Sequence, residues 1–582
     1  MRSRQFAAVA ALLGSALAAD NCRCLPGDDC WPTASDWQQL NKTVDGRLVA
    51  TTPLAAPCHD PEYDDATCQS LRDNWQWPQG HYESSSSVMA PFFANRSCDP
   101  FTSQDTPCEF GNYVRYAINV STSDHVAAGI KFATEKNIRL VVRNTGHDYN
   151  GKSTGAGALA LWTHHLKSLS LTNYTSPSYT GPAIRVGAGV QGGEAYALAS
   201  SAGLAVVGGE CPTVGIAGGY SQGGGHSALS SRYGLGADQV LEWEVVDGTG
   251  TLRRASREEN ADLYWALSGG GAGSWGVVVG MVSKAHEDVV VSGANLTFSL
   301  EGGVPGGDKE VFWSAIAAWQ LELPKFVDRG AMVIWSFTES WFGITPITAP
   351  GVTGEELKEL LAPFEEMLAG WNITYDSYVN QFDGYYEQFT TMQSPIQVGI
   401  AQYGGWLLPR SVVQERNDEI VAAYRDIVED GATFINVALN VSKEVTGDVY
   451  NSVLPAWRDA LVDTVVTTPW NFTAPWEEMI EWQDKMTNNY IPQLTALAPE
   501  SGCYANEGDF RQPNWQKYFY GSNYAKLREI KKKYDPLDLF YGVAAVGSEE
   551  WNVAEDGRMC RTSNSSARTF TRATVPNVLP EL

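Results

Sequence analysis

Residues 138–151 read Ile-Arg-Leu-Val-Val-Arg-Asn-Thr-Gly-His-Asp-Tyr-Asn-Gly. This stretch begins with an apolar, β-prone run from Ile138 to Val142 and ends in polar residues and glycines around His147. A strand that runs into such a loop exposes backbone N–H groups, which bind anions such as a pyrophosphate. The stretch therefore predicts a strand followed by a ligand-binding loop.

A second stretch, residues 208–219, reads Gly-Gly-Glu-Cys-Pro-Thr-Val-Gly-Ile-Ala-Gly-Gly. Its Cys211 stands among glycines, where a backbone approaches a flat ligand closely. A histidine in a turn or a buried cysteine is commonplace when it occurs alone. Together, His147 and Cys211, which are 64 positions apart, are a far more specific signal of a ligand site than either residue alone.

Together the two stretches resemble the berberine-bridge-type FAD-linked oxidases, a branch of the vanillyl-alcohol-oxidase flavoproteins. The resemblance extends from about Cys22 to Arg561. It implies one FAD bonded covalently twice, by His147 to its C8α methyl group and by Cys211 to its C6 atom. It also implies cofactor contacts from Arg143, Asn144, Thr145, Gly146, Asp148, Gly151, Thr213, Val214, Gly215, Gly218, Val278, Asn523 and Tyr524.

The fold implied by the resemblance is α+β and two-lobed, with a PCMH-type FAD-binding domain and an antiparallel-sheet substrate domain that roofs the flavin ring. The residue pattern agrees, because from about Val291 long apolar strands alternate with amphipathic helices. The expected division is a signal peptide (1–19), a Cys-rich N-terminal extension (20–111), the FAD-binding domain (112–290), the substrate domain (291–500), a C-terminal segment returning to the FAD lobe (501–562) and a tail (563–582).

Local patterns predict individual elements. In the first lobe we expect a helix that Ser123 caps and that runs to about Lys136, and a second helix over 257–267. In the second lobe we expect strands over 331–337 and 434–441 and helices over 354–368 and 416–429. A Lys-rich helix before Pro536 should be solvated, and the resemblance returns it to the FAD lobe.

The glycine-rich run Gly269–Gly276 superficially resembles a dinucleotide-binding fingerprint. In a Rossmann fold these glycines follow a strand and open a helix, whereas here they follow a predicted helix and lead into a strand. We therefore reject a Rossmann fold.

Oxidation of an alcohol by a flavin needs a base for the hydroxyl proton. Tyr504 lies in a Tyr-x-Asn element that the resemblance assigns to this role, although a tyrosine needs nearby donors or positive charge to lower its pKa from about 10. Other members of the resembled family place a glutamate base on a strand of the substrate lobe. A glutamate base is not expected here, because the region that corresponds to this strand, 397–409, contains no carboxylate. Many members of the resembled family carry a histidine after a Val-Gly-x-Gly-Gly segment, whereas this chain reads Val214-Gly-Ile-Ala-Gly-Gly-Tyr220. The resemblance therefore implies that the family's imidazole near the flavin is either replaced by Tyr220 or supplied by His226, although His226 is equally compatible with a structural role.

Composition limits the cellular setting. A basic start and an apolar run from Phe6 to Leu17 predict a secretory signal peptide, so the chain should be secreted and extracellular. Removal of Arg2 and Arg4 with this peptide changes the net charge from −26 to −28, which disfavours nucleic acid and anionic membranes as partners. Nine Asn-x-Ser/Thr sequons predict a glycosylated surface: Asn41, Asn95, Asn119, Asn173, Asn295, Asn372, Asn440, Asn471 and Asn564.

The cysteine count predicts disulfides and one free thiol. Without Cys211, nine cysteines remain, an odd number. The segment around Cys560 resembles a regular feature of the family, and this resemblance groups Cys560 with the seven N-terminal cysteines as an even set. Cys503 is then left as a buried free thiol beside Tyr504. In the alternative, Cys503 pairs with Cys560 and an N-terminal cysteine is free.

The sequence thus predicts a secreted, monomeric FAD-linked oxidase that acts on a small molecule, a sugar, an aromatic alcohol or a secondary metabolite, and reduces O2 to H2O2. Val214, at the family's oxygen-gating position, resembles oxygen-using members. A dehydrogenase with another electron acceptor and an inactive ligand-binding glycoprotein are the alternatives. No metal site is expected, since the eight histidines show no His-x-x-x-His spacing.

Overall fold

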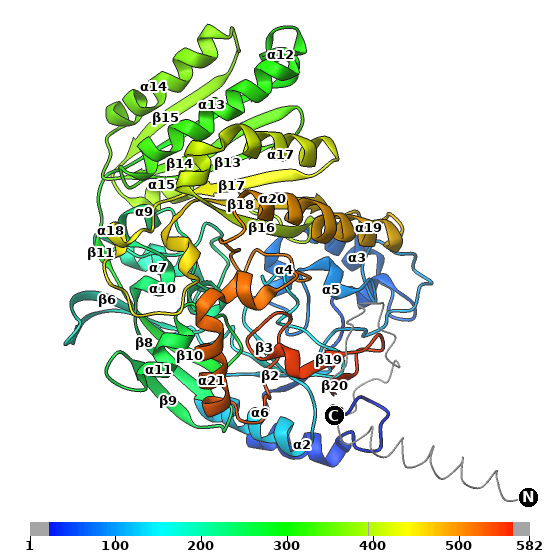
Figure 1. Cartoon of the computed structure of the whole chain (residues 1–582). Coiled ribbons are helices and arrows are strands. Elements are labelled where there is room, and N and C mark those ends of the chain that lie inside the picture. Colours follow the sequence, from blue (N-terminus) through cyan, green and yellow to red (C-terminus); the bar gives the residue numbers. More distant parts are fainter. Residues whose placement is uncertain (1–21, 394, 563–582) are drawn as a thin grey trace, which may run out of the picture.

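A computed structural model describes residues 22–393 and 395–562, and the predicted signal peptide, the tail and the sequon at Asn564 lie outside them. Figure 1 shows the two expected lobes. The first surrounds the strands β2 (Tyr116–Asn119), β3 (Leu140–Arg143), β8 (Val240–Asp247) and β10 (Gly276–Lys284), and the second surrounds a large sheet covered by helices. The fold is α+β, as the sequence predicts.

The first lobe contains two sheets. The four-stranded sheet has the order β1 (Leu48–Ala50), β2 (Tyr116–Asn119), β4 (Leu159–Trp162) and β3 (Leu140–Arg143), and the five-stranded sheet has the order β5 (Leu169–Ser176), β6 (Tyr179–Gly187), β10 (Gly276–Lys284), β8 (Val240–Asp247) and β9 (Leu252–Ser256). In the first sheet β2, β4 and β3 run parallel. The His147 loop therefore leaves the carboxyl edge of this sheet, the usual place for a binding loop.

The helices of the first lobe follow the predicted pattern with small shifts. The helix α6 (Ser123–Glu135) is capped by Thr122, whose side chain accepts the N–H of His125, so the predicted cap at Ser123 was wrong by one residue. The others are α7 (Gly192–Ser200), α8 (Ser221–Gly223), α9 (Ser230–Tyr233), α10 (Gly236–Gln239) and α11 (Ala261–Leu267). The short strands β7 (Leu204–Ala205) and β11 (His286–Glu287) pair with each other.

The N-terminal extension packs against the first lobe and is cross-linked by disulfides. Its elements are α2 (Ala34–Thr43), β1, α3 (Asp65–Asn74), α4 (Pro78–Tyr82) and α5 (Pro91–Ala94), and β1 pairs antiparallel with β2. Four disulfides join Cys22–Cys560, Cys24–Cys30, Cys58–Cys68 and Cys98–Cys108. Cys503 is free and buried, as the cysteine count predicts. The sequon at Asn95 is buried, so this asparagine is not part of the exposed surface.

The second lobe is one seven-stranded antiparallel sheet with helices packed on it (Figure 1). The strand order is β15 (Asp376–Phe382), β12 (Val291–Ser299), β14 (Trp341–Pro350), β13 (Met332–Phe337), β17 (Thr433–Ala438), β18 (Ala460–Pro469) and β16 (Ala401–Pro409). The helices are α12 (Leu300–Gly303), α13 (Lys309–Val327), α14 (Gly354–Gly370), α15 (Tyr385–Met392), α16 (Arg410–Glu415), α17 (Asn417–Glu429), α18 (Lys443–Thr446), α19 (Trp476–Lys485) and α20 (Ile491–Leu497).

The C-terminal segment returns to the first lobe. The helix α21 (Tyr524–Tyr534) packs near α11, and Trp275 donates its indole N–H to the carbonyl of Leu527. The strands β19 (Trp551–Val553) and β20 (Met559–Arg561) then form a hairpin.

The prediction that the Lys-rich helix is fully solvated was wrong at Lys531. Its side chain is 0% exposed and donates to the Asp535 carboxylate at 2.8 Å and to the carbonyls of Ser274 and Phe540. Asp535 in turn accepts the N–H groups of Leu539 and Phe540. The ion pair thus fixes the turn that ends α21.

We expect Lys531→Met to lower the free energy of unfolding by about 3–5 kcal/mol, because it leaves a buried carboxylate without its cation. The exposed Lys532 on the same helix provides the control, and Lys532→Met should change the value by less than about 0.5 kcal/mol. Urea unfolding measures both variants. Equal stabilities would contradict the assigned role of the pair.

Candidate functional site

The His147 loop is held from beneath by Arg143, the last residue of β3. Its guanidinium is completely buried and donates to the backbone carbonyls of His81, Ser84 and Ser87 in the N-terminal extension. The Gly146 backbone has φ +84°, and a Cβ there would lie 2.7 Å from this guanidinium. The Arg143 side chain therefore supports the loop.

The other side of the loop is closed by Asp148. Its carboxylate accepts the backbone N–H of Lys152 at 2.6 Å and the hydroxyl of Ser153. Thr145 is buried within the loop. Gly151 has φ +64°, and a Cβ there would collide with the Phe93 ring. These contacts fix the direction in which His147 points.

The structure brings His147 and Cys211 together, as the resemblance implies. The Cys211 Sγ lies 4.0 Å from the His147 Nε2 atom. The hydroxyl of Thr213 contacts both atoms, at 2.8 Å from the same nitrogen and 3.3 Å from the sulfur. Two side chains that are 64 positions apart thus converge on one point.

Both groups are uncharged at neutral pH. Burial, with His81 and Arg143 nearby, lowers the pKa of His147 to about 3. Burial raises the pKa of the Cys211 thiol, while its hydrogen bond to Thr213 acts in the opposite direction. The imidazole therefore keeps the lone pair that a bond to carbon requires.

Asn144 lines a cradle of small residues beside this pair. Its amide N–H donates to the carbonyl of Ala188 at 2.6 Å, whereas its buried Oδ1 has no hydrogen-bond partner. A Cβ at Gly215 or Gly218 would lie 2.5 or 3.0 Å from the Asn144 amide nitrogen. An unpartnered acceptor beside glycines fits a flat polar ligand, which is the shape and chemistry of a flavin ring.

Tyr504 is placed so that two N–H groups point at its phenol oxygen. The side chain of Asn506 donates to it at 2.8 Å and the backbone of Gly225 at 3.2 Å. Burial and then the Glu507 charge raise the pKa of Tyr504 well above 10, whereas the two donors act to lower it. The side chain of Asn150 bonds the carbonyl of Ala505, so the Tyr504 segment is tied to the His147 loop.

A buried acid cluster surrounds His226, whose ring packs edge-on to Tyr504 at 5.6 Å between centroids. The His226 ring nitrogens lie 3.4 Å from a Glu210 oxygen and 3.0 Å from a Glu507 oxygen. Burial lowers the pKa of His226, but the two carboxylates outweigh it and raise the pKa well above 6.5. His226 is therefore an imidazolium at neutral pH, and the Tyr220 hydroxyl donates to its backbone carbonyl.

The acid cluster was not predicted. Asp463 lies on β18, opposite Leu407 of β16. The segment 397–409 contains no carboxylate, but the neighbouring strand β18 provides one. Burial and the nearby Glu507 raise the pKa of Asp463. His226, Asp463 and Glu507 each offer one atom that can bind a metal ion, and these three atoms lie within 4.8 Å of one another. The cluster could therefore hold a metal ion. Glu210 directly precedes Cys211, and Glu507 follows Tyr504 by three positions, and this proximity in sequence was the one available signal.

Other predicted cofactor contacts lie in less direct positions. The Asn523 amide donates to the carbonyls of Ser452 and Val453, and the Tyr524 hydroxyl donates to Glu549. Both side chains thus donate their hydrogen bonds to acceptors within the protein. Val278 is buried in β10, and Val214 follows the Cys211 turn, with its N–H bonded to the Cys211 carbonyl.

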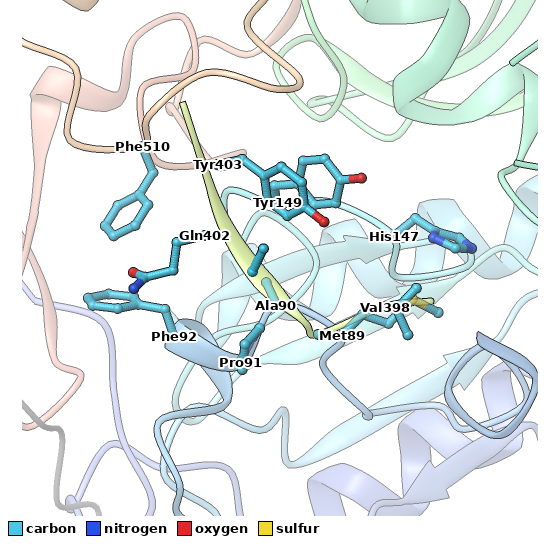
Figure 2. A pocket seen from close by; sticks show the side chains of 12 residues that line it. Met89, Ala90, Pro91, Phe92, His147, Tyr149, Val398, Gln402, Tyr403 and Phe510 are labelled. Atoms are coloured by element: carbon cyan, nitrogen blue, oxygen red, sulfur yellow. The ribbon is translucent and has the colours of Figure 1, made fainter. Parts of the chain in front are cut away.

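A cavity opens beside His147 (Figure 2). Its walls come from the N-terminal extension, the His147 loop, the start of β16 and the segment after Tyr504. The lining residues are Met89, Ala90, Pro91, Phe92, His147, Tyr149, Val398, Gly399, Ala401, Gln402, Tyr403 and Phe510.

Comparison with known proteins identifies the family. A profile described as an FAD binding domain matches residues 114–256, and one described as berberine and berberine-like matches residues 503–546. The FAD-linked oxidoreductase ZEB1 of Gibberella zeae is 50% identical over 548 residues, which are 93% of this chain and 95% of that protein. The chain belongs to the FAD-linked oxidoreductases of the vanillyl-alcohol-oxidase type.

Solved structures of this type share the fold. The VAO-type flavoprotein MtVAO615 from Myceliophthora thermophila C1 superimposes with a TM-score of 0.88 at 41% identity and covers 93% of this chain and 100% of that chain. Glucooligosaccharide oxidase from Acremonium strictum, described as carrying a 6-S-cysteinyl, 8α-N1-histidyl FAD, has a TM-score of 0.61 at 19% identity, over 75% of this chain and 92% of that chain. Within residues 22–393 and 395–562, no helix is both long and apolar enough to cross a membrane.

We expect Gly215→Ala to reduce the amount of bound flavin, because the new methyl group would displace Asn144 from the cradle. Gly370, at the end of α14 in the second lobe, is the matched control, since a Cβ there meets nothing within 4 Å. Absorbance near 450 nm, divided by protein absorbance, measures flavin occupancy. Full occupancy in Gly215→Ala, equal to that of Gly370→Ala, would show that the close approach is unimportant.

Proposed function

We propose that the chain is a secreted oxidase whose FAD is attached to both His147 and Cys211, and that it oxidises an alcohol with O2 as electron acceptor. The 4.0 Å approach of these two side chains, held around the Thr213 hydroxyl, carries the proposal. A flavoprotein of the same fold is described with the corresponding double linkage. The predicted site residues and domain ranges are part of this proposal.

The bound flavin would supply the acceptor of a hydride, its N5 atom. Tyr504 would take the proton of the substrate hydroxyl, with the N–H groups of Asn506 and Gly225 holding the negative oxygen. His226, anchored by Glu210 and Glu507, would fix the loop that carries Gly225. The alcohol loses one hydride and one proton and becomes a carbonyl compound.

Reoxidation of the reduced flavin would require O2, which accepts two electrons and two protons and leaves as H2O2. Val214 stands three residues beyond Cys211 and supports O2 rather than another acceptor. The four disulfides, the sequons and the apolar N-terminal run support export of a glycosylated monomer. Peroxide formation under air distinguishes this oxidase from a dehydrogenase.

We expect acid precipitation of the protein to leave a yellow pellet, since the flavin is bound covalently. Either His147→Ala or Cys211→Ala should retain one linkage, and the double variant should release its flavin into the supernatant. Cys503→Ala, which removes the other free thiol, is the control and should behave as the unchanged protein. Recovery of all flavin in the supernatant of the unchanged protein would refute the covalent attachment.

We expect Tyr504→Phe to retain its flavin but to slow anaerobic flavin reduction by a substrate about 10²–10⁴-fold, the usual effect of removing a general base. Because the pKa of Tyr504 is raised, its phenolate fraction should grow with pH. The reduction rate of the unchanged protein should therefore rise between pH 6 and 9, and this rise should disappear in Tyr504→Phe. Stopped-flow absorbance measures both rates.

Tyr424→Phe is the control for a buried hydroxyl, because Tyr424 bonds Thr464 in the second lobe. Its reduction rate should equal that of the unchanged protein. If Tyr504→Phe is reduced equally fast at every pH, another group takes the proton.

A further inference from the structure

Asp463 is a buried carboxyl group whose Oδ2 atom accepts no hydrogen bond. The residue lies on β18 and is only 1% exposed, and no donor among the described residues bonds this oxygen. Besides burial, which has the largest effect, the charges that act on the pKa of Asp463 are those of Glu507, His226 and Glu210. A carboxylate at this depth needs donors or a cation to compensate for its lost hydration.

Two further metal-binding side chains converge on Asp463. One atom from each of His226, Asp463 and Glu507 lies within 4.8 Å of the other two. The His226 Nε2 and the Glu507 Oε1 are 3.0 Å apart. Atoms that bind one Zn²⁺ at about 2.0–2.2 Å lie up to about 4.4 Å from each other. Small side-chain rotations are therefore sufficient for all three groups to bind one ion.

The charge balance of this cluster also favours a cation. Together with Glu210, three carboxyl groups surround the single imidazole of His226. One imidazolium neutralises one carboxylate, so the fully ionised cluster keeps an excess of negative charge in a buried position, which is costly. A divalent ion that replaces one proton of His226 adds net positive charge and lowers this excess.

Glu210 lies where a carboxylate supports a metal-bound histidine. The His226 Nε2 faces Glu507, whereas the Nδ1 atom of the same ring lies 3.4 Å from the Glu210 Oε1. Histidines that bind metals usually present their other ring nitrogen to a carboxylate or carbonyl, which fixes the orientation of the ring. Glu210 is not a member of the group of three and is therefore assigned this supporting role.

The chemistry of the three groups selects the ion. One imidazole nitrogen and two carboxylate oxygens form a mixed set, whereas Ca²⁺ and Mg²⁺ prefer oxygen ligands alone. Zn²⁺ binds imidazole together with carboxylates, and three protein ligands leave the fourth position of its tetrahedron for water.

We propose that His226, Asp463 and Glu507 bind one Zn²⁺ ion, with Glu210 orienting the imidazole. The ligands come from three separate segments, so the spacing of histidines in the sequence gives no sign of the site. The site lies apart from the proposed flavin linkages and does not depend on the oxidase function. The ion joins strand β18 to the turn after Tyr504 and to the segment around His226.

Metal analysis of the flavin-loaded protein tests the proposal. The protein is freed of metals with EDTA and dialysed against Zn²⁺, and its metal content is measured by mass spectrometry. We expect the unchanged protein to hold one Zn²⁺ more per chain than Asp463→Asn or Glu507→Gln, which keep the side-chain shape but remove a charged ligand. Glu210→Gln should retain the ion but bind it about 10-fold more weakly by calorimetry.

A second buried histidine provides the matched control. His125 is 3% exposed and its Nε2 lies 3.1 Å from the Asp45 carboxylate, but it is not part of the group of three. His226→Gln should lose the ion, whereas His125→Gln should bind Zn²⁺ as the unchanged protein does. If His226→Gln does not fold, the Asp463→Asn and Glu507→Gln variants still decide the question.

Thermal unfolding gives a readout that needs no substrate. Zn²⁺ at about 100 times its Kd should raise the Tm of the unchanged protein by about 2 °C and leave the Tm of Asp463→Asn unchanged. Ca²⁺ and Mg²⁺ at the same concentration should have no such effect.

The outcomes separate the metal site from the oxidase function. Equal Zn²⁺ contents in the unchanged protein and in Asp463→Asn, or an equal Tm rise in both, would overturn the site. Tighter binding of Ca²⁺ than of Zn²⁺ would overturn the assigned ion. Protein that binds Zn²⁺ in the expected way but forms no peroxide would keep the site and contradict the oxidase, and peroxide formation by protein that binds no Zn²⁺ would do the reverse.

Discussion

The buried guanidinium of Arg143 is the contact on which the site depends. It binds three carbonyls of the segment 81–87 and lies directly under the Gly146 turn. A buried cation without a carboxylate partner is stable here because carbonyl dipoles surround it. This one side chain joins the strand β3, the His147 loop and the N-terminal extension that continues into the cavity wall at Met89–Phe92.

The second lobe contributes to the site through strand register. Leu407 of β16 pairs with Asp463 of β18, and this register turns Asp463 into the acid cluster around His226. Because a shift of one residue would move the carboxylate to the other face of the sheet, the sheet itself specifies the electrostatics beside Tyr504. The Asn150 bond to Ala505 then ties the Tyr504 segment to the flavin lobe.

Features with a local cause could be predicted from the sequence. The apolar run before the His147 loop forms β3, and the predicted helices over 354–368 and 416–429 are α14 and α17. The odd number of cysteines predicts a free thiol, whereas the choice of Cys503 over its alternative pairing with Cys560 rested on the resemblance around Cys560. By contrast, the Asp463 cluster and the burial of Lys531 depend on contacts between distant segments, which no local pattern contains. Asn523 and Tyr524 were assigned by resemblance alone, and their polar groups bond elsewhere.

The disulfide between Cys22 and Cys560 spans 538 positions, whereas the other three span 6, 10 and 10. The short bridges close within segments that emerge early from a ribosome, but Cys22 has to wait until almost the whole chain has been made. During that time it lies two residues from Cys24, whose partner Cys30 is already available. Once closed, the long bridge makes the two ends of the fold a single covalent ring, so a protease cut in any loop between them opens the ring without releasing a fragment.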